Sequence, residues 1–139
     1  PLFDIGQTSP KQDVEWMKSF MSIKDQLDFK FIFCLEGKCI STNLHWAMSS
    51  NSVCVMPKPK YESWFMEGKL EDGVHYIEVK DDFSNAQEKI EFYNNKNDKC
   101  LEIIHNAQKF VKQFKNAKQE RLIQLLILKQ YFQSTGQNG

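Results

Sequence analysis

A glycine followed by a cluster of small polar residues is the feature of this chain best suited to chemistry. Gly37 lies in the segment LEGKCISTNL, and Ser41, Thr42 and Asn43 follow it. Glycine permits a close approach of backbone to ligand, and short hydroxyl and amide side chains donate hydrogen bonds without bulk. Where such a turn joins a strand to a helix, free N–H groups and the helix dipole attract anions. The pattern predicts a diphosphate site at these four residues, unless they only cap a helix that binds no ligand.

A second polar segment, MPKPKYESWFMEG, combines cations with carboxylates. Lys58 and Lys60 bring positive charge to the same expected edge of a sheet, and Glu62 and Glu67 come next. A carboxylate at such a place accepts hydrogen bonds from both hydroxyls of a ribose. If YESWFME is helical, Glu62 and Glu67 lie about 140° apart around the axis, so only one of them faces the cleft. The alternative for either glutamate is an exposed surface charge.

The remaining titratable side chains form no recognised catalytic or metal motif. His45 lies in the first turn of an expected helix, either within reach of a phosphate or as a surface or capping histidine. His75 begins an expected strand, where packing or a backbone hydrogen bond is the simpler explanation. Asp81 and Asp82 precede an expected helix and offset its dipole. No Ser-His-Asp order, HExxH motif or zinc-type cysteine spacing occurs, so we expect no metal site and no cofactor.

Alternating strand and helix patterns position these residues. Apolar, β-rich runs predict strands over residues 29–35, 52–56 and 75–79. Helical spacing predicts helices over residues 44–50, 85–95, 97–114 and 118–132, and shorter ones over 14–21, 23–27 and 61–67. Ser22 and a Ser84–Gln87 capping box mark two helix starts. Alternating strands and helices imply an α/β fold with a parallel sheet flanked by helices, a Rossmann-like half whose ligand binds beyond the carboxyl ends of the strands.

The composition describes one folded domain. The 139 residues allow one core of ordinary size, and the 41% hydrophobic and 13% aromatic content excludes a disordered chain. The 18 basic residues balance the 18 acidic ones, which argues against binding of nucleic acid through bulk charge. No apolar run approaches the roughly 20 residues that span a bilayer. The cysteines fit reduced thiols of a cytoplasmic protein: Cys34, Cys39, Cys54 and Cys100.

Two long stretches of the chain resemble a known enzyme family. The run FIFCLEGKCISTNLHWAMSSNSVCVMPKPKYESWFMEG, followed by GVHYIEVKDDFS, is similar to the C-terminal half of bacterial LpsA-type lipopolysaccharide glycosyltransferases. These enzymes belong to glycosyltransferase family 90, which also contains fungal capsule-associated enzymes and animal protein O-glucosyltransferases. FDIGQT near the start and YFQSTGQ near the end fit the same bacterial branch, so the resemblance covers nearly the whole chain.

The resemblance implies a GT-B-like architecture, in which two Rossmann-like halves face a cleft. Residues 29–139 would form the nucleotide-sugar-binding half with its long C-terminal helices, and residues 1–28 a linker with short helices from the preceding half. That preceding, N-terminal half of the same enzyme, with the acceptor site and the catalytic base, would lie outside this sequence. The isolated chain would then bind its donor weakly and turn over nothing.

The implied reaction moves a hexose from a nucleotide sugar to a lipopolysaccharide, an oligosaccharide or another glycan or lipid-linked acceptor. We expect a UDP-linked donor and a cytoplasmic location at the inner face of the inner membrane, with peripheral membrane contact and no transmembrane segment. By position, the LEGKCISTNL turn would meet the diphosphate, and Glu62, with Glu67 second, the ribose or sugar. The animal branch carries an arginine near Asn43, which pairs bidentately with phosphate as asparagine cannot. The positive charge would instead come from the missing half or from these side chains: Lys38, His45 or Lys58.

Two other functions stay open on the sequence alone. The apolar helices from Asp98 to Phe132 would suit a non-catalytic module that docks a partner. A regulatory nucleotide sensor would bind the same ligand without transferring a sugar. Loss of donor binding on replacement of Ser41 and Thr42, with the fold intact, separates the enzyme from the docking module.

Overall fold

The computed structural model describes residues 3–6, 8 and 15–137. Its centre is a parallel sheet of three short strands, β1 (Phe31–Phe33), β2 (Val53–Met56) and β3 (Ile77–Glu78). The middle strand is β2, with Phe31 opposite Val53 on one side and Val55 opposite Ile77 on the other. Because all three strands run in one direction, their carboxyl ends meet at one edge of the sheet. The predicted α/β class and parallel sheet are confirmed.

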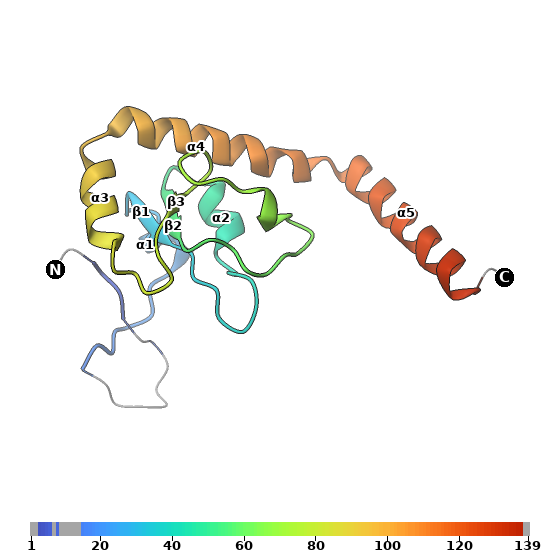
Figure 1. Ribbon diagram of the computed structural model, residues 1–139, viewed down its shortest axis with the longest axis horizontal. Helices are drawn as coiled ribbons and strands as arrows, with labels where there is room; N and C mark the ends of the chain where they lie inside the picture. The colour runs from blue at the N-terminus through green and yellow to red at the C-terminus, as the bar shows by residue number, and fades with distance from the viewer. Residues whose placement is uncertain (1–2, 7, 9–14, 138–139) are drawn as a thin grey trace.

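Helices cover this sheet and extend from it. The described α-helices are α1 (Ile23–Gln26), α2 (Leu44–Met48), α3 (Ala86–Asn94), α4 (Asn97–Lys112) and α5 (Ala117–Thr135). Two short 3-10 turns add to them, η1 (Glu67–Lys69) and η2 (Gln113–Lys115). In Figure 1, α4 lies across the body, where it contacts α2, α3 and β2. The helices predicted to begin near residues 44, 85, 97 and 118 are therefore present.

Alternate positions along the strands pack on opposite faces of the sheet. On one face Ile32 and Cys54 are buried with α2, and on the other Val53 and Val55 are buried with α3. The helix α4 contributes to both clusters, since its first half packs on the second face and its last turns on the first. A parallel sheet covered on both faces needs apolar strands throughout. Each fully buried Val or Ile side chain contributes about 1.5–3 kcal/mol to that packing.

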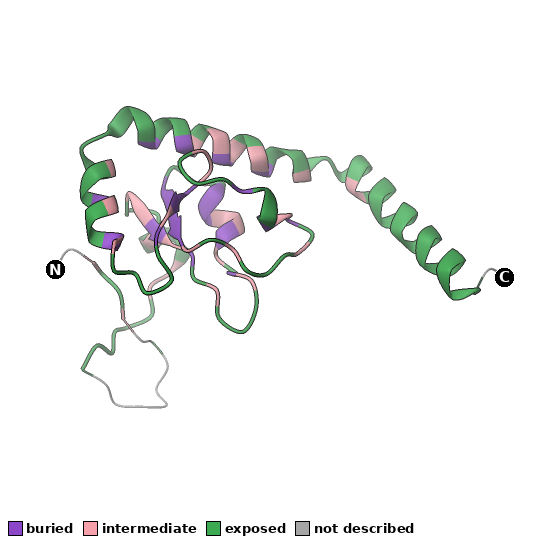
Figure 2. Cartoon of the chain, viewed as in Figure 1, coloured by how far each residue is buried: buried purple, intermediate pink, exposed green. Residues whose placement is uncertain are grey.

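The last helix, α5, leaves this body (Figure 1). None of its 19 residues is buried, and Figure 2 shows it exposed along nearly its whole length. Its large apolar side chains are all exposed: Leu122, Ile123, Leu125, Leu126, Ile127, Leu128, Tyr131 and Phe132. The predicted helix is confirmed, but it contributes nothing to the two core clusters. Among the described residues, no helix combines the length with the low polarity that crossing a bilayer requires.

The structure corrects the helix predicted over residues 61–67. Only η1 forms there, and it starts at Glu67. The Ser63 N–H and the Ser63 Oγ both donate to the Glu67 carboxylate, each at 2.7 Å, and Met66 adopts the left-handed region with φ of 57°. Side-chain hydrogen bonds of this kind compete with helix formation, and a positive φ leaves the α-helical path.

The helix predicted over residues 14–21 is also wrong where the chain is described. Residues 15 and 16 form a turn, Met17 is a single bridge residue, and residues 18–21 have no regular structure. Trp16 and Phe20 are exposed. A short helix whose apolar side packs on nothing is not stable in water. Val14, the first residue of that prediction, lies outside the described residues.

One of the two predicted helix caps is confirmed and the other is wrong. Ser22 and Asp25 form a reciprocal capping box at the start of α1. The start of α3 has no box between Ser84 and Gln87. Asn85 is the residue before its first turn, and the Asn85 Oδ1 accepts a hydrogen bond from the Lys80 N–H at 2.8 Å. This contact holds Asn85 as the residue before the helix, so α3 begins at Ala86, one residue later than the sequence pattern predicts.

A matched pair on α4 tests the core. Ile103 is 1% exposed and belongs to the cluster with Val53 and Val55, whereas Leu101 on the same helix is 63% exposed. We expect Ile103→Ala to lower the free energy of unfolding by about 2–5 kcal/mol, and Leu101→Ala to change it by less than about 0.5 kcal/mol. Urea titration followed by circular dichroism measures both. Equal effects of the two variants would contradict this packing.

The titration of His75 tests its packing. The His75 ring lies against Phe110 with centroids 5.3 Å apart, and Nδ1 accepts a hydrogen bond from the Glu71 N–H at 3.2 Å. Burial disfavours the imidazolium and lowers the His75 pKa below 6.5, although the Glu71 charge opposes this shift.

The unfolded chain therefore binds this proton more tightly than the folded one. Stability from His75 is complete above about pH 6.5 and is lost as the pH falls from there through the folded pKa. An NMR titration of the His75 ring should give a lower pKa in the folded protein than in urea. A folded value equal to or above the unfolded one would contradict the burial.

Candidate functional site

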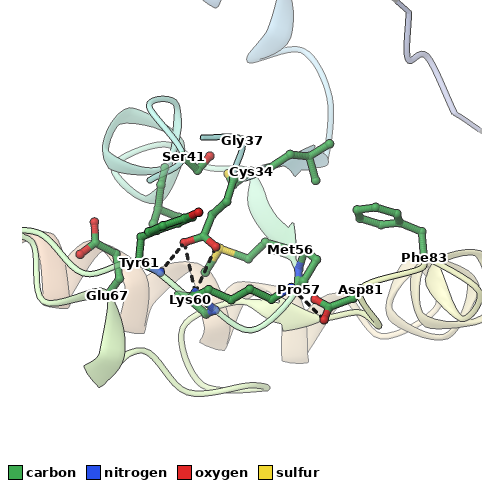
Figure 3. Close-up of a pocket in the computed structure, with 14 residues that line it drawn as sticks. Cys34, Gly37, Ser41, Met56, Pro57, Lys60, Tyr61, Glu67, Asp81 and Phe83 are labelled. Carbon is green, nitrogen blue, oxygen red and sulfur yellow. Dashed lines mark hydrogen bonds and ion pairs between the residues drawn. The ribbon is translucent and has the colours of Figure 1, made fainter. Parts of the chain in front are cut away.

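A pocket lies at the edge of the sheet where the carboxyl ends of the strands meet (Figure 3). Its volume is about 310 Å³. It is lined from the β1 end by residues 34–37, from β2 by Met56, Pro57 and 59–61, and from the β3 end by Asp81 and Phe83. Ser41, Leu44 and Glu67 complete the wall. All three strand ends thus supply lining residues, at the edge where α/β sheets bind ligands.

Polar contacts join the three loops at the rim of this pocket. The Glu36 carboxylate accepts hydrogen bonds from two successive backbone N–H groups, those of Lys60 at 3.0 Å and Tyr61 at 3.2 Å. The Lys60 ammonium forms an ion pair with Asp81 at 2.9 Å, and this contact raises the Lys60 pKa. We refer to Glu36, Lys60, Tyr61 and Asp81 as the rim network. It connects the loops after β1, β2 and β3. Figure 3 labels Lys60, Tyr61 and Asp81 and draws the contacts as dashed lines.

Two of the four residues predicted to meet a diphosphate line the pocket. Gly37 has open space where a side chain would begin, and Ser41 is buried in the wall. The Ser41 Oγ donates to Asn43 Oδ1 at 2.6 Å, and Asn43 Nδ2 donates to the Phe33 carbonyl at 2.8 Å. Asn43 therefore anchors the turn to the end of β1 and does not itself line the pocket. Thr42 is exposed beside it and is not a lining residue either.

The helix that follows this turn is short. α2 has five residues, and no side-chain hydrogen bond caps it. A helix of little more than one turn has a small dipole compared with a long one. The Gly37 N–H already donates to the Cys39 carbonyl at 3.2 Å, so attraction of an anion to this turn must come from other N–H groups and from side chains.

The side chains predicted to supply positive charge lie away from the pocket lining. Lys38 and Lys58 are exposed. The His45 ring packs against Trp64 and Phe65, with centroids 5.0 and 4.4 Å away. The His45 Nε2 atom is buried and has no hydrogen-bond partner among the described residues. The lysine that does line the pocket belongs to the rim network.

The two predicted ribose carboxylates have different surroundings. Glu67 lines the pocket and is 1% exposed, but Ser63 already donates to both of its oxygens. Glu62 is exposed and lies over Gly68, where an added Cβ would be 3.4 Å from the Glu62 carboxylate oxygens. Glu62 makes no hydrogen bond to another described residue. Glu67 thus lines the pocket but is held within the structure, whereas Glu62 is exposed outside the pocket lining.

Two residues with left-handed backbone conformation flank the pocket. Met66 has φ of 57° and precedes Glu67, and Phe83 has φ of 58° and lines the pocket itself. The Phe83 ring packs edge-on against Phe33, with centroids 6.4 Å apart. Bulky residues rarely adopt this conformation, and such strain gathers at functional sites. This observation supports the pocket as the functional site independently of its place in the fold.

Sequence reasoning missed most of the rim network. Lys60 was placed at this edge but given no role, and Asp81 was expected only to offset a helix dipole. Asp81 instead pairs with Lys60, while Asp82 accepts a hydrogen bond from the Ser84 N–H, which lowers the Asp82 pKa. The sequence feature that could have predicted the network is position along the chain, since each of these side chains follows a strand. In the part of the chain that is described, no three His, Cys, Asp or Glu side chains are grouped to hold a metal ion.

Comparison with known proteins gives a family and two relatives. The family model described as Glycosyl transferase family 90 matches residues 5–133. O-glucosyltransferase LpsA of Dichelobacter nodosus is 42% identical over 133 residues, which cover 95% of this chain and 42% of that protein. Uncharacterized protein 179R of Invertebrate iridescent virus 6 is 30% identical over 94 residues, 63% of this chain and 8% of that protein. The chain thus matches less than half the length of either relative.

The buried carboxylate of the pocket wall gives a stability test. Ser63→Ala removes the hydroxyl that binds Glu67 and leaves only the Ser63 N–H. Because an underpaired buried polar group costs about 1–3 kcal/mol, we expect the free energy of unfolding to fall by that amount. Ser49→Ala, at an exposed serine of the α2 end, should change it by less than about 0.5 kcal/mol. Urea titration that finds both variants equal to the original protein would show that Ser63 does not hold Glu67.

Proposed function

This chain belongs to glycosyltransferase family 90, and we propose that it binds the nucleotide-sugar donor of an enzyme that moves a hexose to a lipopolysaccharide or related glycan. The pocket at the carboxyl ends of the parallel sheet carries the proposal, because sheets of this kind bind nucleotides at that edge. The 42% identity to an O-glucosyltransferase supports hexose transfer as the reaction.

In this proposal residues 29–139 are one Rossmann-like half of a GT-B-like enzyme, and residues 1–28 lead in from the other half. The parallel sheet with helices on both faces supports such a half. The other half would hold the acceptor and the catalytic base. The carboxylates that line this pocket already bind protein groups, Glu36 and Asp81 in the rim network and Glu67 at Ser63, which is consistent with a base supplied from elsewhere.

We assign the diphosphate to the turn that contains Gly37 and Ser41. The open space at Gly37 lets a phosphate oxygen approach the backbone, and the Ser41 hydroxyl can turn from Asn43 to donate to it. Asn43 positions the turn through the Phe33 carbonyl, and Thr42 supplies a hydroxyl at its exposed side.

The chemical role of these groups follows from the charge that develops during transfer. As the bond from the sugar to the phosphate oxygen breaks, negative charge grows on the diphosphate. Fixed hydrogen-bond donors and a nearby cation stabilise that charge without reorganising at the moment of reaction. Lys60 is the cation that lines this pocket, whereas Lys38, His45 and Lys58 do not line it.

The ribose is assigned to Glu62 before Glu67. Glu62 lies outside the pocket lining, but it is exposed and makes no hydrogen bond to other described residues, so its oxygens can accept from two ribose hydroxyls of a ligand that extends beyond the pocket. The Glu67 carboxylate is buried and bound by Ser63, which suits a structural part of the wall. We further propose a cytoplasmic location, because the four cysteines are free thiols and thiols persist in reducing compartments.

A docking module is the second candidate function, and the exposed apolar side chains of α5 favour it. Titration calorimetry separates the two candidates. We expect uridine diphosphate and UDP-glucose to bind the chain weakly, with a dissociation constant on the order of 1 mM, and Ser41→Ala to weaken binding further. Absence of heat at millimolar ligand, with the chain folded, would contradict the donor site and leave the docking function.

The two glutamates give a paired prediction. Glu62→Gln removes the charge that accepts ribose hydroxyls, so we expect about tenfold weaker binding of uridine diphosphate with an unchanged unfolding midpoint. Glu67→Gln disturbs the pair with Ser63, so we expect a lower unfolding midpoint as its main effect. Calorimetry and thermal unfolding of both variants measure this contrast. The opposite pattern, with Glu67→Gln losing affinity at full stability, would reassign the ribose to Glu67.

A further inference from the structure

The rim network contains two backbone N–H groups that point at one anion. The N–H groups of Lys60 and Tyr61 are consecutive, and both donate to the carboxylate of Glu36, which comes from a loop 24 residues earlier. Successive N–H groups arranged in this way bind anions in proteins. Pro57 and Pro59, which precede them, carry no N–H and restrict the backbone that presents the pair. The anion bound here is one that the protein itself supplies.

The Lys60 side chain, which brings positive charge to the pocket, is also paired with a carboxylate of the protein itself. The Lys60 ammonium is paired with Asp81 at 2.9 Å. Of the charged side chains that line the pocket, Glu36, Glu67 and Asp81 are acidic and Lys60 is basic. A pocket with this balance repels a diphosphate as long as its donors serve internal carboxylates. A diphosphate can therefore bind in this pocket only if it takes the place of the Glu36 and Asp81 carboxylates at these donors.

We propose that the N–H groups of Lys60 and Tyr61, together with the Lys60 ammonium, form a phosphate-binding site that Glu36 and Asp81 occupy and that a phosphoryl group takes over. This inference rests on the proposed donor binding only for the identity of the ligand. The site itself is defined by the groups that already hold a carboxylate.

The exchange is feasible for three reasons. A phosphate oxygen and a carboxylate oxygen accept the same charge-assisted hydrogen bonds, so the N–H groups lose no partner. Lys60 and Asp81 are 63% and 64% exposed, and exposed ion pairs contribute little to stability. Gly37, adjacent to Glu36, has no atom within 4 Å of the place where a Cβ would lie, and the conformational freedom of glycine lets the loop backbone turn the Glu36 side chain outward. Glu36 then acts as an internal competitor that weakens anion binding.

The test measures binding of inorganic pyrophosphate by calorimetry at low ionic strength. Glu36→Gln keeps the shape of the side chain but weakens its hold on the two N–H groups, so we expect about tenfold tighter binding than in the original protein. Asp81→Asn frees the Lys60 ammonium and should also tighten binding. Addition of Lys60→Met to either variant should abolish the gain. Glu102→Gln, an exposed carboxylate on α4 outside the pocket, is the matched control and should change nothing.

Unchanged or weaker pyrophosphate binding in Glu36→Gln would overturn the inference. Unfolding of both Glu36→Gln and Asp81→Asn would overturn it too, because the carboxylates would then hold the structure together instead of occupying an exchangeable site. Uridine, which carries no phosphate, keeps the test separate from the proposed function. Tighter pyrophosphate binding without any binding of uridine or uridine diphosphate would support this site and contradict the donor proposal.

Discussion

Burial of a very small parallel sheet on both faces is the constraint on which the rest of this structure depends. With helices packed on each side, the strand positions are apolar, from Ile32 on one face to Val55 on the other, except for Glu78 at the end of β3. Polar side chains are thereby confined to the ends of the strands and to the loops that follow them. Because the three strands are parallel, these ends coincide, and the polar residues that follow each strand gather at one pocket. The location of the site is a consequence of the packing.

The parts of the fold that the sequence predicted are those set by local pattern. Apolar runs gave the three strands, and spacing of three and four residues gave α4 and α5. The helix predicted over residues 61–67 failed because a side chain of the same segment, Glu67, binds the Ser63 backbone. The rim network could not be predicted from the sequence, for a different reason. The Glu36 contact joins residues 24 positions apart, and no periodicity records such a pairing.

The sequence predicted which turn lies at the candidate site, but it did not predict which charged side chains line the pocket. Gly37 and Ser41 line the pocket where the pattern put them, but the cations assigned by type and spacing do not. His45 shows why, since its ring is drawn into contact with Trp64 and Phe65 by the same apolar packing that forms the core. Lys60 lies at the pocket because the loop after β2 is fixed by two prolines and by Glu36. If the chain binds a nucleotide-sugar donor as proposed, the Glu36 and Asp81 carboxylates of the rim network are the groups that would leave their present partners.

The central claim is that a nucleotide diphosphate binds at the strand ends of this sheet. Backbone amide chemical shifts of the labelled chain during titration with uridine diphosphate test it most directly. The account predicts shifts concentrated at Gly37, Ser41, Lys60 and Tyr61, with α5 unaffected. Chemical-shift changes confined to α5 or to the faces of the sheet, with no change at the strand ends, would contradict it.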